Sequence, residues 1–248
     1  MTLQKILNDL EDYLEYKRDD GATSMEVDPQ VVRNLSKPAP EQESEPAPAA
    51  EPAAATPAQA SSLDNVAEQI AACTKCSLHE TRTKAVPGQG SSSPEIMFIG
   101  EAPGADEDKQ GLAFVGRAGQ LLTKMIEAMG FTRDEVFIGN ILKCRPPDNR
   151  TPIPDEMGTC MPYLKEQIRL LKPKVIIALG ATAVKGLLDV RTGITKLRGT
   201  WMAFEGIDLM PTYHPAYLLR NPAAKKDVWE DLKEVLHFLG RPVPQTKK

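Results

Sequence analysis

Four cysteines are the residues of this 248-residue chain whose spacing most directly suggests chemistry. Cys73 and Cys76 form a tight C-x2-C pair, Cys144 follows a short apolar run, and Cys160 falls in the helical stretch that comes next. Such a set can place four thiolates around one centre. Structural zinc usually draws on two tight pairs, and one pair with two scattered cysteines is at least as compatible with a [4Fe–4S] cluster. Spacing alone supports a zinc site and a [4Fe–4S] cluster equally. It makes ordinary buried thiols the weaker interpretation.

A second set of candidate residues lies in GEAPGADEDKQGLAF, residues 100–114, directly after the apolar run EIMFIG. Its glycines and proline predict a turn, and we expect Phe114 at its end to be exposed. Its carboxylates argue against a phosphate-binding loop, because they would repel the phosphate. The ordinary alternatives are a solvated acidic loop and a core position for Phe114.

Two further polar residues follow the ends of other apolar runs. The carboxamide of Asn140 can both donate and accept a hydrogen bond, which suits the edge of a planar base. His214, in YHPAYLLR, is a candidate for a general acid or for charge stabilisation. A lone asparagine is more often a turn cap, and a lone histidine is more often structural.

Apolar runs and helical stretches alternate from residue 63 onward. Strands are predicted at EIMFIG (95–100), VFIGN (136–140), KVIIALG (174–180) and IDLMPTYHP (207–215). Helices are predicted at 117–130, 154–173, 180–189 and 225–240. This alternation predicts a three-layer α/β/α fold with a mainly parallel central sheet. Ligands bind beyond the carboxyl ends of such strands, so one rim should carry 100–114, 140–149 and 214–220.

The ends of the chain differ from this domain, which we place at residues 63–240, with a C-terminal tail at 241–248. Residues 1–21 predict an amphipathic helix, which either docks on the domain or binds a protein partner; its apolar face holds Leu3, Ile6, Leu7, Leu10 and Leu14. Residues 22–62 predict a disordered linker, because the stretch 37–62 has six Pro, nine Ala and four Glu but no large apolar side chain.

Charge and hydropathy narrow the class of protein. Residues 1–62 hold 12 acidic and 5 basic side chains, whereas the remainder holds 22 acidic and 25 basic ones, so the predicted domain is mildly basic. No run approaches the 18 apolar residues of a membrane span, and the charged N-terminus has no signal-peptide core. We therefore expect a cytoplasmic protein without membrane association, whose cysteines stay reduced.

Three stretches in order carry a family resemblance: GEAPGADEDKQGLAFVGRAGQLL, NILKCRPPDNRTP and HPAYLLRNP. Together with the four-cysteine pattern, they resemble the family 4 uracil-DNA glycosylases, bacterial and archaeal enzymes with an iron–sulfur cluster. The resemblance covers residues 63–240. It implies hydrolysis of the N-glycosidic bond of deoxyuridine in DNA, giving free uracil and an abasic site, as the first step of base-excision repair. It also implies a monomer whose [4Fe–4S] cluster is held by Cys73, Cys76, Cys144 and Cys160.

The resemblance also implies how the base would be bound. The pocket floor would be shaped by Gly100, Glu101 and Ala102. Phe114 would stack on uracil, and Asn140 would read its O4/N3 edge. The small side chain at position 102 keeps the pocket open.

Catalytic and discriminating roles follow from the same resemblance. Glu107 would crowd the C5 position and exclude the methyl group of thymine, and His214 would face O2. Family 1 enzymes have a water-activating aspartate where this chain has Ala102. The water would therefore be activated or positioned by Glu101 or Asn149.

The stretch HPAYLLR supplies candidates for contact with DNA. Leu218 or Leu219 could wedge into the base stack, although core packing is an equal alternative for both. Arg220 could contact a phosphate.

The stretch LLDVRTGITKLRGTW lacks the histidine and the insertion through which one subgroup bonds covalently to abasic DNA, so we expect an enzyme that turns over. The alternative class is a non-catalytic DNA- or partner-binding protein with the same fold.

Overall fold

The structure is a computed structural model that describes residues 62–244. The predicted N-terminal helix at 1–21, almost all of the predicted linker at 22–62 and the last residues of the predicted tail lie outside the described residues. These three interpretations therefore stay predictions.

A six-stranded sheet forms the centre of the molecule, in the order β1-β3-β2-β4-β6-β5. Its four inner strands are parallel: β3 (Phe137–Asn140), β2 (Ile96–Gly100), β4 (Val175–Leu179) and β6 (Ile207–Thr212). The two edges are antiparallel: β1 (Gln89–Gly90) and β5 (Met202–Phe204). The predicted mainly parallel sheet is confirmed, and every residue of β2, β3 and β4 is buried, as their nearly continuous apolar runs require.

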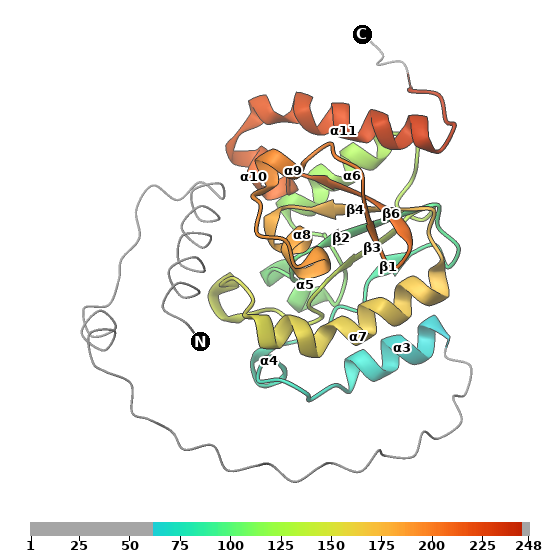
Figure 1. The fold of residues 1–248 in the computed structure, drawn as a ribbon. Coiled ribbons are helices and arrows are strands. Elements are labelled where there is room, and N and C mark those ends of the chain that lie inside the picture. Colours follow the sequence, from blue (N-terminus) through green and yellow to red (C-terminus); the bar gives the residue numbers. More distant parts are fainter. Residues whose placement is uncertain (1–61, 245–248) are drawn as a thin grey trace, which may run out of the picture. The chain divides into compact units, whose positions relative to one another are not determined.

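Helices cover both faces of this sheet and complete the three predicted layers (Figure 1). One face carries α6 (Arg117–Ala128) and α11 (Lys225–Phe238), and the other carries α7 (Pro154–Leu171) with α3 (Leu63–Ala71) against it. The remaining helices are short: α4 (Leu78–Thr81), α5 (Ala105–Gln110), α8 (Ala181–Leu188), α9 (Ile194–Leu197) and α10 (Pro215–Arg220), with 3₁₀ turns η1 (Pro147–Asn149) and η2 (Pro222–Ala224).

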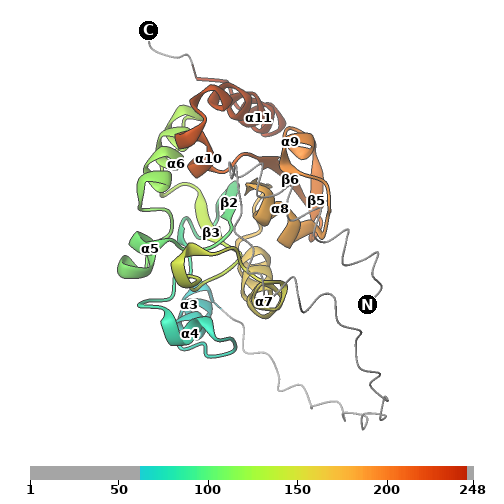
Figure 2. The same ribbon diagram turned by 90° about the vertical axis from the view of Figure 1, so that its left-hand side faces the viewer.

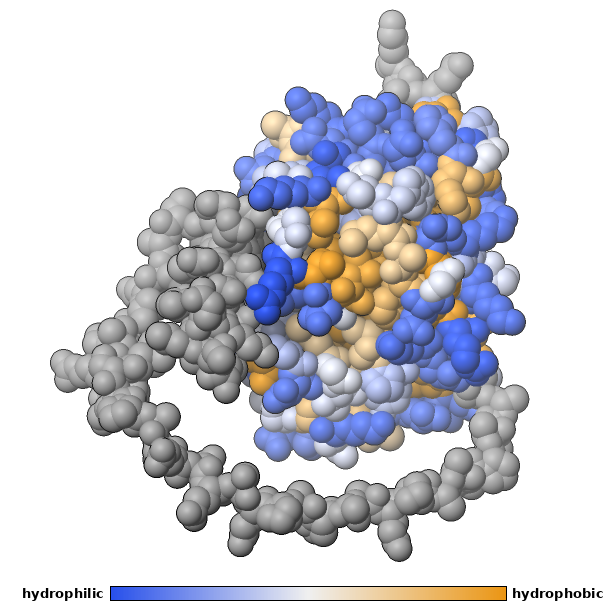
Figure 3. All heavy atoms as spheres, in the orientation of Figure 1, coloured by the Kyte–Doolittle hydropathy of each residue, from blue (hydrophilic) through white to orange (hydrophobic). Residues whose placement is uncertain are grey.

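Amphipathic spacing explains why the long helices lie where they do. In α11 the buried apolar residues are Val228, Leu232, Val235 and Leu236, which share one helical face. Each such side chain contributes about 1.5–3 kcal/mol when fully buried. Figure 3 shows the outcome on the surface: hydrophilic side chains cover most of the outer sides of α11 and α7, and the largest apolar area of the face shown lies between these layers.

The strand order creates a crevice at the carboxyl ends of the inner strands. From β2 the chain passes to β3 on one side and then to β4 on the other, so the loops after β2 and β4 diverge. Gly100 pairs with Asn140 and Leu179 with Thr212, which aligns the strand ends. Figure 2 looks toward this rim, with α5 and α10 near the ends of β2 and β3.

The stretch 100–114 is not a simple turn, and this part of the prediction was wrong. It contains α5, which begins after Gly104 and ends at Gly111 with a φ of 78°. Three of its acidic residues lie in the first helical turn, where they complement the positive end of the helix dipole. The carboxylate cluster therefore has a local structural cause.

None of the helices in the described part of the chain is both long and apolar enough to cross a lipid bilayer.

The core divides into two clusters. The larger one surrounds the sheet, and the smaller one lies between α3, α4 and α7 and contains Cys144 and Cys160.

Candidate active site and cysteine pocket

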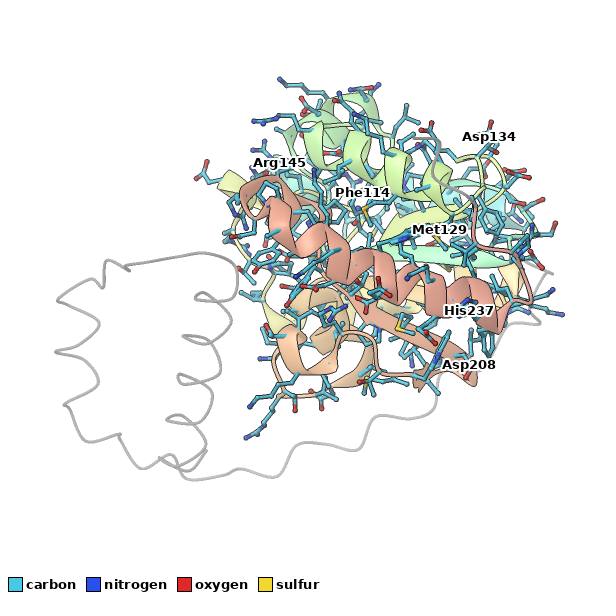
Figure 4. All side chains as sticks on the ribbon, turned by 90° about the horizontal axis from the view of Figure 1, so that it is seen from above. Phe114, Met129, Asp134, Arg145, Asp208 and His237 are labelled. Carbon is cyan, nitrogen blue, oxygen red and sulfur yellow. The ribbon has the colours of Figure 1, made fainter. Side chains whose placement is uncertain are left out.

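A cavity of about 430 Å³ opens at the rim where the inner strands end. This volume is that of a small-molecule site. Apart from Gly100, all the uracil-binding and catalytic residues predicted from the sequence line its walls: Glu101, Ala102, Glu107, Phe114, Asn140, Asn149 and His214. Arg220, a predicted DNA contact, lines it as well. Figure 4 shows Phe114 and Arg145 toward one end of the molecule and Asp208, near the start of β6, toward the other. The three predicted rim segments therefore do converge.

Phe114 lies in the cavity wall but is only 6% exposed, so the prediction of an exposed ring was wrong. Its φ is 52°, an unusual backbone conformation for an aromatic residue and one that concentrates at functional sites. A Cβ on Gly119 would come within 1.9 Å of the Phe114 carbonyl oxygen, so only glycine lets α6 approach this closely. The ring centroids of Phe114 and His214 are 5.7 Å apart.

Gly100 supports the pocket by having no side chain. A Cβ at this position would lie 2.5 Å from Asn140 Oδ1 and 2.5 Å from Phe114 Cζ. Any other residue would therefore displace the two side chains predicted to contact the base.

Asn140 is 2% exposed, and its Oδ1 atom has no hydrogen-bond partner in the structure. A buried acceptor without a partner costs about 1–3 kcal/mol, so its presence in a cavity wall indicates a ligand that donates to it. The backbone around it is firmly held, because Lys143 Nζ donates to the Asn140 carbonyl oxygen at 2.8 Å and Ile141 N donates to the Gly100 carbonyl at 3.0 Å.

Glu107 holds the loop that carries Phe114. Its carboxylate accepts from the backbone N–H groups of Gly104 at 3.1 Å, Val115 at 2.7 Å and Gly116 at 2.9 Å. These bonds fix the chain on both sides of α5 and directly after Phe114. The sequence analysis missed this structural role, although glutamate three residues after the N-cap Gly104 is a helix-start signal.

His214 follows β6 as the N-cap of α10. Its Nδ1 accepts a hydrogen bond from the Ala216 backbone N–H at 3.1 Å, so a neutral ring carries its proton on Nε2. Burial, with a smaller contribution from the positive charge of Arg220, lowers the pKa of His214 to about 4. The imidazole is therefore neutral at pH 7 and offers one N–H donor.

The remaining predicted residues come from the η1 turn and from α10. Asn149 has a φ of 54°, and its Oδ1 accepts from Arg145 Nε at 2.7 Å. Leu219 is 39% exposed, whereas Leu218 is 1% exposed and packs in the core. The prediction of Leu218 as a DNA contact is therefore corrected. The two leucines are neighbours on a one-turn helix, and only one of them can face inward.

The four cysteines line a second, small cavity between α3, α4 and α7. Cys73 and Cys76 lie on the loop between α3 and α4, Cys144 follows β3, and Cys160 is on α7, as predicted. All four are free thiols. Burial raises the pKa of Cys160 to about 11 and also raises that of Cys144, so without metal these thiols are protonated at pH 7.

The surroundings of this cavity fit an anionic thiolate cluster. Besides His79, its lining includes the basic side chains of Lys75, Arg82 and Lys143, and it includes no carboxylate. Arg82 Nη1 donates to Cys144 Sγ at 3.0 Å, and the Lys143 backbone N–H donates to Cys160 Sγ at 3.4 Å. Hydrogen bonds to sulfur are typical of iron–sulfur sites.

The described residues hold no group of three or more His, Cys, Asp or Glu side chains arranged to bind a single metal ion. A [4Fe–4S] cluster takes one thiolate at each corner, so its ligands lie farther apart than the four sulfurs around one zinc, each about 2.3 Å from the metal.

Three residues of these sites were missed by sequence reasoning. Lys143 is 1% exposed and binds Asn140 and Gln167, and burial lowers its pKa to about 8. Thr182 is buried in the pocket wall with its Oγ1 unpartnered. Arg82 contacts a cysteine 62 residues away. No local pattern marks these side chains, because their partners come from distant elements.

Comparisons with known proteins agree with this geometry. A family model described as the uracil DNA glycosylase superfamily matches residues 87–233. The type-4 uracil-DNA glycosylase of Sulfurisphaera tokodaii is 48% identical over 183 residues, covering 70% of this chain and 83% of that protein. That of Thermotoga maritima is 44% identical, covering 72% and 95%, and that of Archaeoglobus fulgidus is 41% identical, covering 74% and 96%. The chain belongs to the uracil-DNA glycosylase superfamily.

Proposed function

We propose that this protein is a monofunctional uracil-DNA glycosylase of the type-4 class, which hydrolyses the N-glycosidic bond of deoxyuridine in DNA and starts base-excision repair. The observation that carries this proposal is the buried, unpartnered Oδ1 of Asn140 in the same cavity wall as Phe114 and His214. These three side chains match three parts of uracil. The Asn140 acceptor suits the N3–H edge, the Phe114 ring suits the flat face, and the neutral His214 N–H suits the O2 atom that gains charge as uracil leaves.

In this proposal, the base enters the cavity after leaving the DNA stack, which costs a few kcal/mol. Stacking on Phe114 offsets part of that, at about 1–3 kcal/mol per base. Asn140 accepts from N3–H and donates to O4, while Gly100, Glu101 and Ala102 form the floor. Glu107 excludes the methyl group of thymine from the C5 position.

Cleavage of the N-glycosidic bond produces positive charge on the sugar and negative charge on the leaving uracil. Residues of this chain would stabilise both charges. The sugar develops oxocarbenium character, which nearby carboxylates such as Glu101 favour. The leaving uracil gains negative charge on O2, and His214 Nε2–H donates to it in the manner of an oxyanion hole. Glu101 or Asn149 positions the attacking water; the Asn149 carboxamide is oriented for this by its bond from Arg145.

DNA would lie across the mouth of the cavity. Leu219 is exposed on α10, the helix that also carries Arg220, and can enter the gap left by the flipped nucleotide. Arg220 lines the cavity and can contact a phosphate. The half-buried Tyr217 on the same helix also faces the cavity.

We further propose that Cys73, Cys76, Cys144 and Cys160 hold a [4Fe–4S] cluster. When bound, it would supply a cross-link between the 73–76 loop, the loop after β3 and α7. Free thiols and such a cluster suit a reducing compartment, which supports the cytoplasm as the location. A monomer in solution, and a protein partner for residues 1–21, are also part of this proposal.

Purified protein should be brown, contain about four irons per chain, and release free uracil from a uracil-containing oligonucleotide. Iron analysis and product chromatography on one preparation measure both. If colourless protein that contains zinc released uracil, the proposed iron–sulfur cluster would be wrong, but the proposed enzymatic activity would stand. Brown protein that binds the oligonucleotide without releasing uracil would identify a non-catalytic binding protein.

Removing residues 1–60 should leave the melting temperature and the rate of uracil release nearly unchanged. The stretch 37–62 has no large apolar side chain to contribute to a core. The truncated chain keeps the cap of α3, where Ser62 Oγ accepts from Asn65 N at 3.2 Å. Thermal unfolding and single-turnover kinetics of the two proteins provide the test. A large loss in either would mean that the Leu3–Leu14 face docks on the domain.

A further inference from the structure

Arg82 joins two parts of the cysteine pocket that are far apart in the sequence. It is the C-cap residue of α4 and is half-buried. Its Nη1 donates to Cys144 Sγ at 3.0 Å, and its Nη2 donates to the carbonyl oxygen of Ala71 at 2.7 Å. Ala71 ends α3, directly before the loop that carries Cys73. One guanidinium thus joins the end of α3, next to the loop of the tight pair, to the distant Cys144.

The other two cations of the pocket make different contacts. Lys75 Nζ lies over the Tyr163 ring, 4.8 Å from its centroid, and is exposed. Lys143 Nζ donates to the carbonyl oxygen of Asn140 and to Gln167 Oε1, both at 2.8 Å. Among the hydrogen bonds of the described residues, Arg82 is therefore the charged side chain that donates to a cysteine sulfur.

A charged donor on a ligand sulfur has a defined effect on an iron–sulfur cluster. The reduced cluster carries one more negative charge than the oxidised one, so the hydrogen bond stabilises the reduced state more. Reduction potentials of such clusters depend on hydrogen bonds to their sulfurs, on net charge and on solvent exposure. Burial makes this contact stronger than it would be in water.

We propose that Arg82 is an outer-sphere partner of the cluster, which raises the potential of its one-electron couple and keeps Cys144 within reach of the Cys73–Cys76 loop. This inference rests on the cluster assigned under the proposed function, and it assigns no redox step to uracil excision. In the experiment, the electron comes from an electrode. The same contact would slow loss of the cluster, because a ligand that is held in place rebinds more readily after a bond to iron opens.

The test is the reduction potential of full-length, cluster-loaded Arg82→Met, measured by film voltammetry beside the parent. At a fixed electrode potential, we expect the ratio of reduced to oxidised cluster to fall about tenfold, which is 59 mV for a one-electron couple. Visible absorbance followed in air should decay several-fold faster. Arg82→Lys keeps the charge but cannot span both acceptors, so its potential should lie between those of Arg82→Met and the parent.

Lys75→Met is the matched control, because it removes an equal charge from the same pocket without removing a bond to sulfur. Its potential should shift much less than that of Arg82→Met. Equal shifts in the two variants, or no shift in Arg82→Met, would overturn the proposal. If Arg82→Met folds by circular dichroism but loses its iron on purification, the retention role is supported, and Arg82→Lys then tests the potential. A parent protein without iron would overturn both this inference and the cluster, whereas a brown parent that releases no uracil would affect only the enzymatic proposal.

Discussion

Replacing Asn140 by alanine should slow single-turnover release of uracil about a hundredfold. Each buried polar group that is left without a partner costs about 1–3 kcal/mol, and the variant would leave two such groups of uracil, N3–H and O4. A factor of ten in rate corresponds to about 1.4 kcal/mol. The melting temperature should change little, because Oδ1 has no partner within the folded chain that the substitution would remove. Rapid-quench kinetics and thermal unfolding of parent and variant measure the two effects.

Two further variants make this result specific. Asn140→Asp should also lose uracil release, because the carboxylate repels O4 and cannot donate to it, but it gains an acceptor for the amino group of cytosine. Asn65→Ala, at an exposed position of α3, should behave as the parent. Release of uracil by Asn140→Ala at the parent rate would mean that another residue reads the base.

The inner sheet could be predicted because its signal is local. Three of its four strands, β2, β3 and β4, are short apolar runs that end at a glycine or an asparagine, and burial on both faces requires such a run. The order of the strands then places their carboxyl ends together, so the rim residues could be assigned to one site. The amphipathic helices α6, α7 and α11 were predictable for the same reason: their predicted first residues agree with the structure, and their predicted last residues lie two positions too far along the chain.

The missed elements depend on contacts that no local window contains. The edge strands β1 and β5 span two and three residues, and they are extended because they pair with β3 and β6. The α5 helix was hidden by its glycines, which signal a turn but here form the two caps. Arg82 and Lys143 illustrate the same limit for the sites, since only folding brings them to Cys144 and Gln167.

Replacing His214 by alanine should reduce the rate of uracil release by a factor of about 10²–10³, the usual effect of losing one oxyanion donor. The affinity for uracil-containing DNA should fall far less, because the bond strengthens only as charge develops on O2. Single-turnover rates and DNA binding isotherms of the same protein separate the two quantities. His237→Ala is the matched control, since His237 is exposed on α11, away from the cavity.

The pH dependence tests the form of the donor. The pKa of a free histidine is about 6.5, and burial lowers that of His214 to about 4, so the parent imidazole stays neutral from pH 8 down to about pH 5. His214 should therefore cause no change in rate over this range, although it destabilises the fold as pH falls from 6.5 toward 4, where the unfolded chain binds the extra proton. A parent rate that rose as pH fell through 6.5, and that lost this rise in His214→Ala, would require an imidazolium donor. Equal losses of rate and DNA affinity in His214→Ala would instead show that His214 only positions α10 on the DNA, and stabilisation of the leaving uracil would then fall to another donor of the cavity.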